Sequence, residues 1–265
     1  MDDLTGKKQR FLGLMREGWF TVFIILLIAI AWEWGVSVGW VSFLFFPPPS
    51  VIISTFIKLI ANHKLTDNTG ITLWRVFLGL ILGGIPGLIL GLILGWSHRL
   101  YRLVNPLIAA THPIPKIAIL PLIMIIFGIG ESSKVVVIAL TAFFPLLINT
   151  AAGVQQINPI HFEVAKNYGA NLTKIFTRVI FPGSLPLILT GLRLSLNLAL
   201  LVSIAVELVS AQKGLGAMIW LAWQTLRTEE LYVSLVMTAL LGVFFNFFLQ
   251  RIAIHLVPWK TEQRI

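Results

Sequence analysis

Long, nearly uninterrupted apolar runs constrain this chain more than any other feature. They begin near Trp19, recur to about Leu256, and several exceed the roughly 18 residues that mark a membrane-spanning helix. Backbone N–H and C=O groups in hydrocarbon must bond within the protein, so only helices and closed barrels cross a bilayer. Barrel strands would alternate apolar and polar residues, and these runs do not. We therefore expect an all-α membrane protein.

The overall composition supports this fold class. Hydrophobic residues make up 57% of the chain and charged residues 12%, and the mean hydropathy is +0.90. That leaves too little polar surface for a water-soluble globule. The chain has no Cys, which excludes disulfides, thiolate metal sites and a Cys nucleophile. The net charge of +9 points to cytoplasmic loops of a membrane protein, so no nucleic-acid partner is expected.

The apolar runs predict six transmembrane helices in one domain of residues 19–256. A cytoplasmic N-terminal segment, 1–18, precedes this domain, and a tail, 257–265, follows it. A helix at about 51–62 is too short to span and is expected to lie at the periplasmic interface. The six spans are expected at about 19–36, 72–96, 103–127, 134–152, 184–209 and 231–256.

Two of these spans carry unusual residues. The third holds four prolines, too many for a straight helix, so water or neighbouring groups must satisfy its backbone. The second has glycines at every fourth position. Residues four apart share a helix face, so these glycines predict a groove where another helix packs closely. They are Gly79, Gly83, Gly87, Gly91 and Gly95.

The distribution of Lys and Arg between the two sides of the membrane predicts the orientation. Both termini and the polar loop of residues 155–182 share one side, which carries twelve basic residues against five on the other side. Because basic residues concentrate in cytoplasmic loops, both termini and the polar loop are expected in the cytoplasm. The twelve are Lys7, Lys8, Arg10, Arg16, Arg99, Arg102, Lys166, Lys174, Arg178, Arg251, Lys260 and Arg264, and the five are Lys58, Lys64, Lys134, Lys213 and Arg227.

The chain contains none of the common catalytic motifs. It has no P-loop, no His-Glu-x-x-His and no Gly-x-Ser-x-Gly, so any ATP must be bound by a partner. His112, His161 and His255 lack metal-ligand spacing, and their default role is structural. We expect a protein that is not an enzyme and that binds no cofactor or metal of its own.

Ionisable residues within or near the spans have two interpretations. In the first, Lys116, Arg193, Asn197 and Glu207 line a water-filled pathway that favours an anion, because Arg193, Asn197 and Glu207 lie within about 40° on one helix face. In the second, Lys116 and Arg193 snorkel or hold helices together, and Arg75 and Glu207 cap the outer ends of their spans. The sequence leaves both open.

The polar loop contains a motif with a known counterpart. Glu163-Val164-Ala165-Lys166-Asn167-Tyr168-Gly169 is followed, after nine residues, by Val179-Ile180-Phe181-Pro182. This resembles the Glu-Ala-Ala loop of ATP-binding cassette importer permeases, with apolar replacements at 164, 179 and 181. The resemblance implies that the loop docks on a cytoplasmic ATPase through Glu163, Ala165, Lys166, Gly169 and Pro182. Gly169 would allow a sharp turn between two short helices, and Pro182 would mark re-entry to the membrane.

Further segments resemble one branch of these permeases, the importers of taurine, aliphatic sulfonates, nitrate or bicarbonate. They are Pro113–Leu122, Phe127–Lys134, Phe144-Pro145, Asn149-Thr150, Thr190–Arg193, and Glu207 ahead of Gly214-Leu215-Gly216. Together they extend over about residues 45–255. The closer likeness is to the sulfonate and taurine members.

The resemblance implies a type I importer (MetI-like) permease fold in the bacterial inner membrane. Its partners would be two ATPase subunits that hold ATP and Mg, an external solute-binding protein, and a second permease subunit that makes a homodimer or a pair with a similar subunit. Transport would proceed by alternating access, with the solute a small anion. The competing hypothesis is a stand-alone secondary transporter of a small anion, for which inverted repeats and coupling-ion carboxylates are expected.

Overall fold

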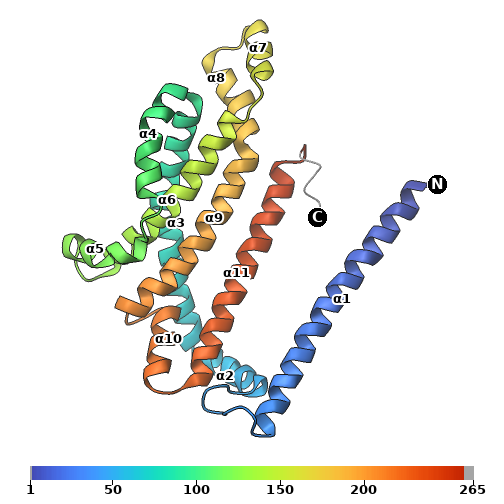
Figure 1. Cartoon of the computed structure of the whole chain (residues 1–265), viewed down its shortest axis with the longest axis vertical. Helices are drawn as coiled ribbons and strands as arrows, with labels where there is room; N and C mark the ends of the chain where they lie inside the picture. The colour runs from blue at the N-terminus through green and yellow to red at the C-terminus, as the bar shows by residue number, and fades with distance from the viewer. Residues whose placement is uncertain (1, 260–265) are drawn as a thin grey trace.

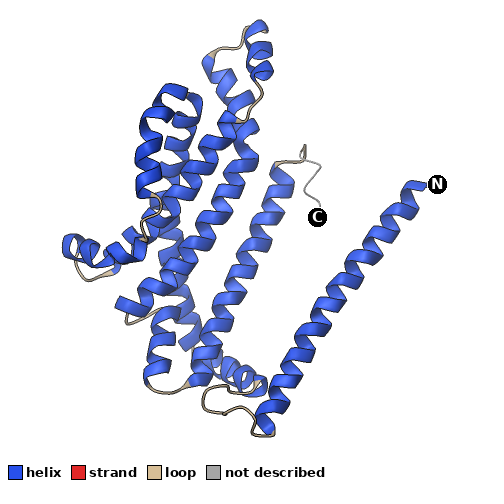
Figure 2. Ribbon diagram, in the orientation of Figure 1, coloured by secondary structure: helices blue, strands red, loops and turns tan. Residues whose placement is uncertain are grey.

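The computed structural model describes residues 2–259, and helices form all the regular secondary structure of this part of the chain (Figure 2). The long helices are α1 (Asp2–Ser37), α3 (Lys64–Trp96), α6 (Glu131–Gln155), α9 (Phe181–Ser210) and α11 (Thr228–Leu256). The short ones are α2 (Pro49–Ala61), α4 (His98–Thr111), the 3₁₀ turn η1 (Lys116–Ile119), α5 (Leu120–Phe127), α7 (Pro159–Asn167), α8 (Leu172–Ile175), the π-helical turn η2 (Phe176–Ile180) and α10 (Leu215–Gln224).

The all-α fold class is confirmed, and the count of six spans stays a prediction. Within the described residues, four helical stretches are long and apolar enough to cross a membrane: Lys64–Trp96, Glu131–Gln155, Leu172–Ser210 and Thr228–Leu256. The bent pair α4 and η1–α5 would make a fifth. The sixth span, in α1, stays a prediction.

Helices α3, α6 and α9 form the centre of the bundle, with α11 against α9 (Figure 1). Helix α1 diverges from the bundle and meets α2 at one end of the molecule (Figure 1). Helices α7 and α8 lie at the opposite end from α2 and α10, and the start of α1 and the end of α11 point toward the α7 end (Figure 1). This arrangement matches the expected grouping of the polar loop with both termini, whose cytoplasmic location stays a prediction.

The third predicted span is broken, as its prolines indicated. Helix α4 and the η1–α5 segment meet at 79°, and the break falls at Pro113 and Pro115, beyond the last residue of α4. Helix α4 begins at His98, ahead of the predicted start of the span near residue 103, which stays a prediction. The Ser97 hydroxyl accepts a hydrogen bond from the Leu100 N–H at 3.4 Å and so caps the helix.

The glycine-rich face of α3 lies directly against α6. A Cβ at Gly83 would lie 1.9 Å from the carbonyl oxygen of Ala139, and one at Gly87 would lie 2.6 Å from that of Phe143. At Gly79, Gly91 and Gly95 a Cβ would meet side chains of α6 at 2.5–2.6 Å. No residue larger than glycine therefore fits along this contact unless the two helices separate.

We predict that Gly83→Ala destabilises the folded protein by about 1 to 3 kcal/mol, since the added methyl must push α3 away from the α6 backbone. The measurement is the thermal or denaturant unfolding midpoint in detergent. Gly70→Ala is the matched control on the same helix, because a Cβ there meets nothing within 4 Å. Better helix propensity should leave that variant as stable as wild type or up to about 1 kcal/mol more stable. Equal effects of the two substitutions would contradict the close contact.

Candidate functional site

The polar loop folds into two short capped helices joined by a tight turn. The Asn158 side chain accepts from the Ile160 N–H at 3.0 Å and caps α7, and the Asn171 side chain accepts from the Lys174 N–H at 2.9 Å and caps α8. Between them Gly169 has φ +70°, a conformation that side chains disfavour. The turn expected at Gly169 is therefore present.

Backbone bonds fix the end of α7 at this turn. The Gly169 N–H donates to the Lys166 carbonyl and the Ala170 N–H to the Ala165 carbonyl, both at 2.9 Å. This is the Schellman pattern, in which a left-handed glycine closes a helix and satisfies its last carbonyls. These bonds fix the direction in which the chain leaves α7 toward α8.

One side of the polar loop packs on the bundle and the other faces outward. Ala165 packs against a small apolar cluster of Val154, Ile175 and Ile180, which Leu92 of α3 also contacts. Exposed apolar side chains lie on the outer side, namely Ile160, Val164, Tyr168 and Leu172. Glu163 and Lys166 are exposed beside them. Exposed apolar groups bordered by charges are typical of a protein-binding surface.

The loop returns to the bundle through a π-helical turn. Residues Phe176–Ile180 form this turn, and α9 begins directly after it with Pro182 as its second residue. Proline has no N–H to donate, so it fits where a helix starts or changes its hydrogen-bond register. Displacement of the polar loop can thus reach α9 without an intervening flexible linker.

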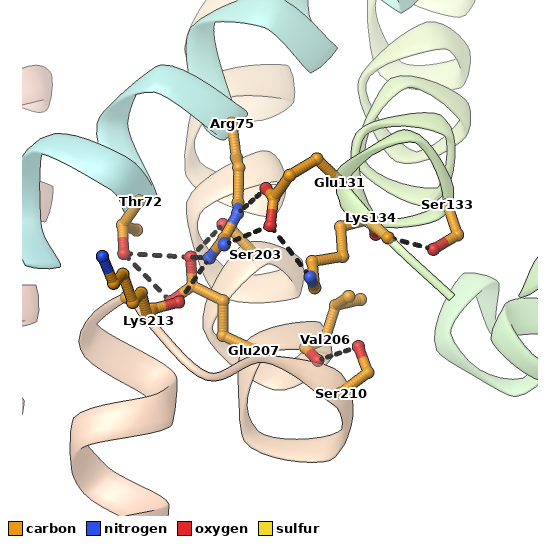
Figure 3. Close-up of polar contacts among 12 residues, drawn as sticks. Thr72, Arg75, Glu131, Ser133, Lys134, Ser203, Val206, Glu207, Ser210 and Lys213 are labelled. Atoms are coloured by element: carbon orange, nitrogen blue, oxygen red, sulfur yellow. Dashed lines mark hydrogen bonds and ion pairs between the residues drawn. The ribbon is translucent and has the colours of Figure 1, made fainter. Parts of the chain in front are cut away.

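A buried ion-pair network joins helices at the opposite end of the molecule (Figure 3). Arg75 of α3 donates through Nη1 to Glu207 of α9 at 2.7 Å, and through Nε and Nη2 to Glu131 of α6 at 2.6 and 2.8 Å. Lys134 adds a bond of 3.0 Å to Glu131. Two cations thus face two carboxylates. Arg75 and Glu207 are almost fully enclosed, whereas the Glu131 side chain is 49% exposed.

The same network holds the start of α10. The N–H groups of Gly214, Leu215 and Gly216 donate to Asn68, Thr72 and Glu207 at 2.7–2.9 Å, and Arg75 donates to the Lys213 carbonyl at 2.8 Å. First-turn N–H groups have no partner within their own helix. A Cβ at Gly216 would lie 2.3 Å from the Ile204 carbonyl oxygen. Side chains of α3 and α9 therefore position α10 closely.

The candidate pathway residues do not form one group. Glu207 has no exposed side-chain surface and pairs with Arg75 rather than with charges along its own helix. Lys116 donates through Nζ to the carbonyls of Thr111, His112 and Ile114 at 2.7–3.0 Å. It thereby stabilises the break after α4. For both residues the geometry favours the structural interpretation.

The other two residues of the predicted stripe are half-buried. Asn197 bonds Asn246 of α11 in both directions at 3.2 and 3.3 Å, and Arg193 lies one turn from it on α9. Sequence reasoning missed Asn68, Thr72, Glu131 and Lys134. A signal was available for the first two, because Asn68, Thr72 and Arg75 share one helix face at spacings of four and three. Among the side chains that the structure describes, those of residues 19–259 apart from residue 21, no three His, Asp or Glu gather in a way that would hold a metal ion.

We predict that Arg75→Met lowers stability by about 3 to 5 kcal/mol, because it leaves Glu207 buried without its partner. The double variant Arg75→Met/Glu207→Met should recover part of this loss, as measured by unfolding in detergent. Arg227→Gln is the control, since the Arg227 side chain is 61% exposed in its pair with Glu230, and such pairs contribute at most about 1 kcal/mol. If the double variant loses more unfolding free energy than the two single variants lose together, a specific Arg75–Glu207 pair is contradicted.

Comparison with known proteins places this architecture in a family. Residues 87–262 match the family model described as "Binding-protein-dependent transport system inner membrane component". The chain is 33% identical to the putative aliphatic sulfonates transport permease protein SsuC of Bacillus subtilis, over 94% of this chain and 91% of that protein. It is 30% identical to the taurine transport system permease protein TauC of Escherichia coli, over 94% and 92%.

A solved structure supports the same assignment at the level of fold. The chain resembles a subunit of the inward-facing MetNI methionine ABC transporter with a TM-score of 0.65 and 21% identity, over 74% of this chain and 97% of that one. The MetI-like fold is thereby confirmed. The findings support a multi-pass protein of the bacterial inner membrane and do not favour a stand-alone transporter. The chain belongs to the binding-protein-dependent transport system inner membrane components and is a permease subunit of an ATP-binding cassette importer.

Proposed function

We propose that this permease carries a small aliphatic sulfonate or taurine into the cell, with nitrate and bicarbonate as the next candidates. It would act as a homodimer with two ATPase subunits and an external solute-binding protein. The names of three relatives support the substrate class, since they are given as aliphatic sulfonate or taurine permeases. This chain has no P-loop of its own, so a separate ATPase subunit must bind and hydrolyse ATP. The polar loop is the part of the permease that would contact that subunit.

The observation that carries the proposal is the polar loop's outward surface. Tyr168 is 88% exposed and Leu172 is 73% exposed, at the end of the molecule away from α10 (Figure 1). We assign this surface to the ATPase, with Glu163 and Lys166 as polar contacts. An apolar centre bordered by charges is the usual anatomy of a stable protein interface.

The packing of the loop offers a route for mechanical coupling. Ala165 contacts a cluster with Val154 of α6 and Leu92 of α3, and the η2 turn continues directly into α9. When ATP closes the ATPase dimer, displaced polar loops would tilt these three helices together. At the other end the Arg75 network joins the same three helices and α10. The bundle would therefore rock as a unit between inward-open and outward-open states.

Reconstituted transport tests the function directly. The permease and its ATPase in proteoliposomes should take up taurine or an alkanesulfonate only with ATP and the loaded binding protein. Nitrate and bicarbonate belong in the same panel. Uptake driven by an ion gradient alone, without ATP, would contradict the proposal and restore the secondary-transporter hypothesis.

We predict that Gly169→Val and Glu163→Lys leave the permease inserted but reduce ATP-dependent uptake by about tenfold or more. The first change strains the turn between α7 and α8, and the second reverses the charge of a proposed polar contact with the ATPase. ATPase retention on affinity purification and uptake are the measurements. Gly128→Val is the matched control, because Gly128 also has positive φ, +84°, with no atom near its Cβ. It lies in the α5–α6 turn, so it should keep the ATPase bound. Full ATPase retention and uptake in both loop variants would contradict the coupling role.

A further inference from the structure

A cavity of about 240 Å³ lies in the groove between α4 and α6. Its volume is below the range typical of drug-sized ligands, so it suits a small solute. Residues of α4 and the α4–η1 link line one side, and two residues of α6 line the other. The lining residues are Tyr101, Asn105, Ile108, Ala109, His112, Pro113, Leu147 and Ile148.

Three hydrogen-bonding side chains, two of α4 and one of its C-cap residue, line this cavity. Tyr101, Asn105 and His112 lie on one helix face, at spacings of four and seven residues. Each can donate a hydrogen bond through its hydroxyl, amide or imidazole. None of the three side chains forms a hydrogen bond with another residue in the described part of the chain. Tyr101 and Asn105 are half-buried and His112 is exposed, so the donors of all three side chains are available to a polar occupant of the cavity.

A positive charge also lies near one end of the cavity, on Lys116, which does not itself line the cavity. The Lys116 ammonium lies 2.9 Å from the His112 carbonyl oxygen and 4.6 Å from the centre of the Phe144 ring. The His112 ring meets the same Phe144 ring edge-on, with centroids 5.5 Å apart. No Asp or Glu lines the cavity. An anion is therefore favoured at the His112 end.

The remaining wall is apolar. Ile108 and Ala109 of α4 face Leu147 and Ile148 of α6 across the cavity, and Ile108 and Leu147 belong to one buried cluster. A short alkyl chain would gain hydrophobic contact along this wall. A solute that joins an anionic head to a short alkyl chain matches both ends.

We infer that this cavity is a binding site for the transported aliphatic anion. His112 binds the anionic head, Asn105 adds a donor, and Ile108 and Leu147 contact the alkyl chain. The inference rests on the proposed function and names a site within the permease. A lipid chain would match the apolar wall but would leave the three donors without acceptors, so the observations favour the anion.

Binding is measured on the permease–ATPase complex in nanodiscs without binding protein, with butanesulfonate as probe and butanol as the uncharged comparison. Butanesulfonate should raise the unfolding midpoint and butanol should not. His112→Phe should weaken the apparent affinity by about tenfold, because a hydrogen bond to a charged group is lost. His112→Gln keeps a donor and should retain most of the affinity. His255→Phe, which changes an exposed histidine on α11, should bind as wild type does.

A second variant tests whether the cavity lies on the transport route. Ala109→Phe fills the space beside the apolar wall, so uptake of octanesulfonate should fall about tenfold relative to ethanesulfonate. Leu107→Phe is the control, because Leu107 is 67% exposed on the same helix and does not line the cavity. Basal ATP hydrolysis and co-purification report whether each variant is assembled.

Three outcomes would overturn the inference. They are no midpoint shift in a wild-type complex that transports sulfonate, an equal shift with butanol, or a shift that survives both His112→Phe and Ala109→Phe. In each case the proposed function can still stand, since uptake is measured separately. A shift that depends on His112 in a complex without ATP-driven uptake would instead retain the site and contradict the proposed function.

Discussion

The close contact between α3 and α6 is the constraint on which the rest of this structure depends. A Cβ at Gly83 would almost coincide with the Ala139 carbonyl oxygen, at 1.9 Å, so the two backbones meet without side chains between them. In a bilayer, where lipid competes with protein for apolar contact, such small-residue packing is a main source of helix association. This packing positions α6 so that one of its ends contacts the Arg75 network and the other contacts the polar loop.

At one end of α6, Glu131 shares Arg75 with Glu207 and so joins the helix to α3, α9 and α10. At the other end, Val154 lies in the cluster that anchors Ala165 of the polar loop. One helix pair thus connects the loop surface to the network at the far end. The cavity between α4 and α6 borders the same helix, so movement of α6 would change its shape.

Much of this architecture could be predicted from the sequence, because apolar runs, glycine spacing and turn glycines are local signals. The contact partners could not. Helical periodicity placed Arg193, Asn197 and Glu207 on one face, yet it says nothing about a residue on another helix. The partner of Glu207 is Arg75, 132 positions away in the chain. Lys116 was likewise considered for the anion pathway because of its distance into the third span. Its position instead depends on the backbone carbonyls that the proline break leaves without helical partners.

The central claim is that the polar loop contacts the ATPase, and site-directed crosslinking tests it most directly. The chain has no Cys, so a single Cys at Tyr168, 88% exposed, can carry a maleimide photocrosslinker in membranes that contain the assembled complex. Ile129, 87% exposed in the α5–α6 turn, provides the comparison site. The account predicts a permease–ATPase adduct from position 168 and none from position 129. No adduct from 168, or equal adducts from both positions, would contradict it.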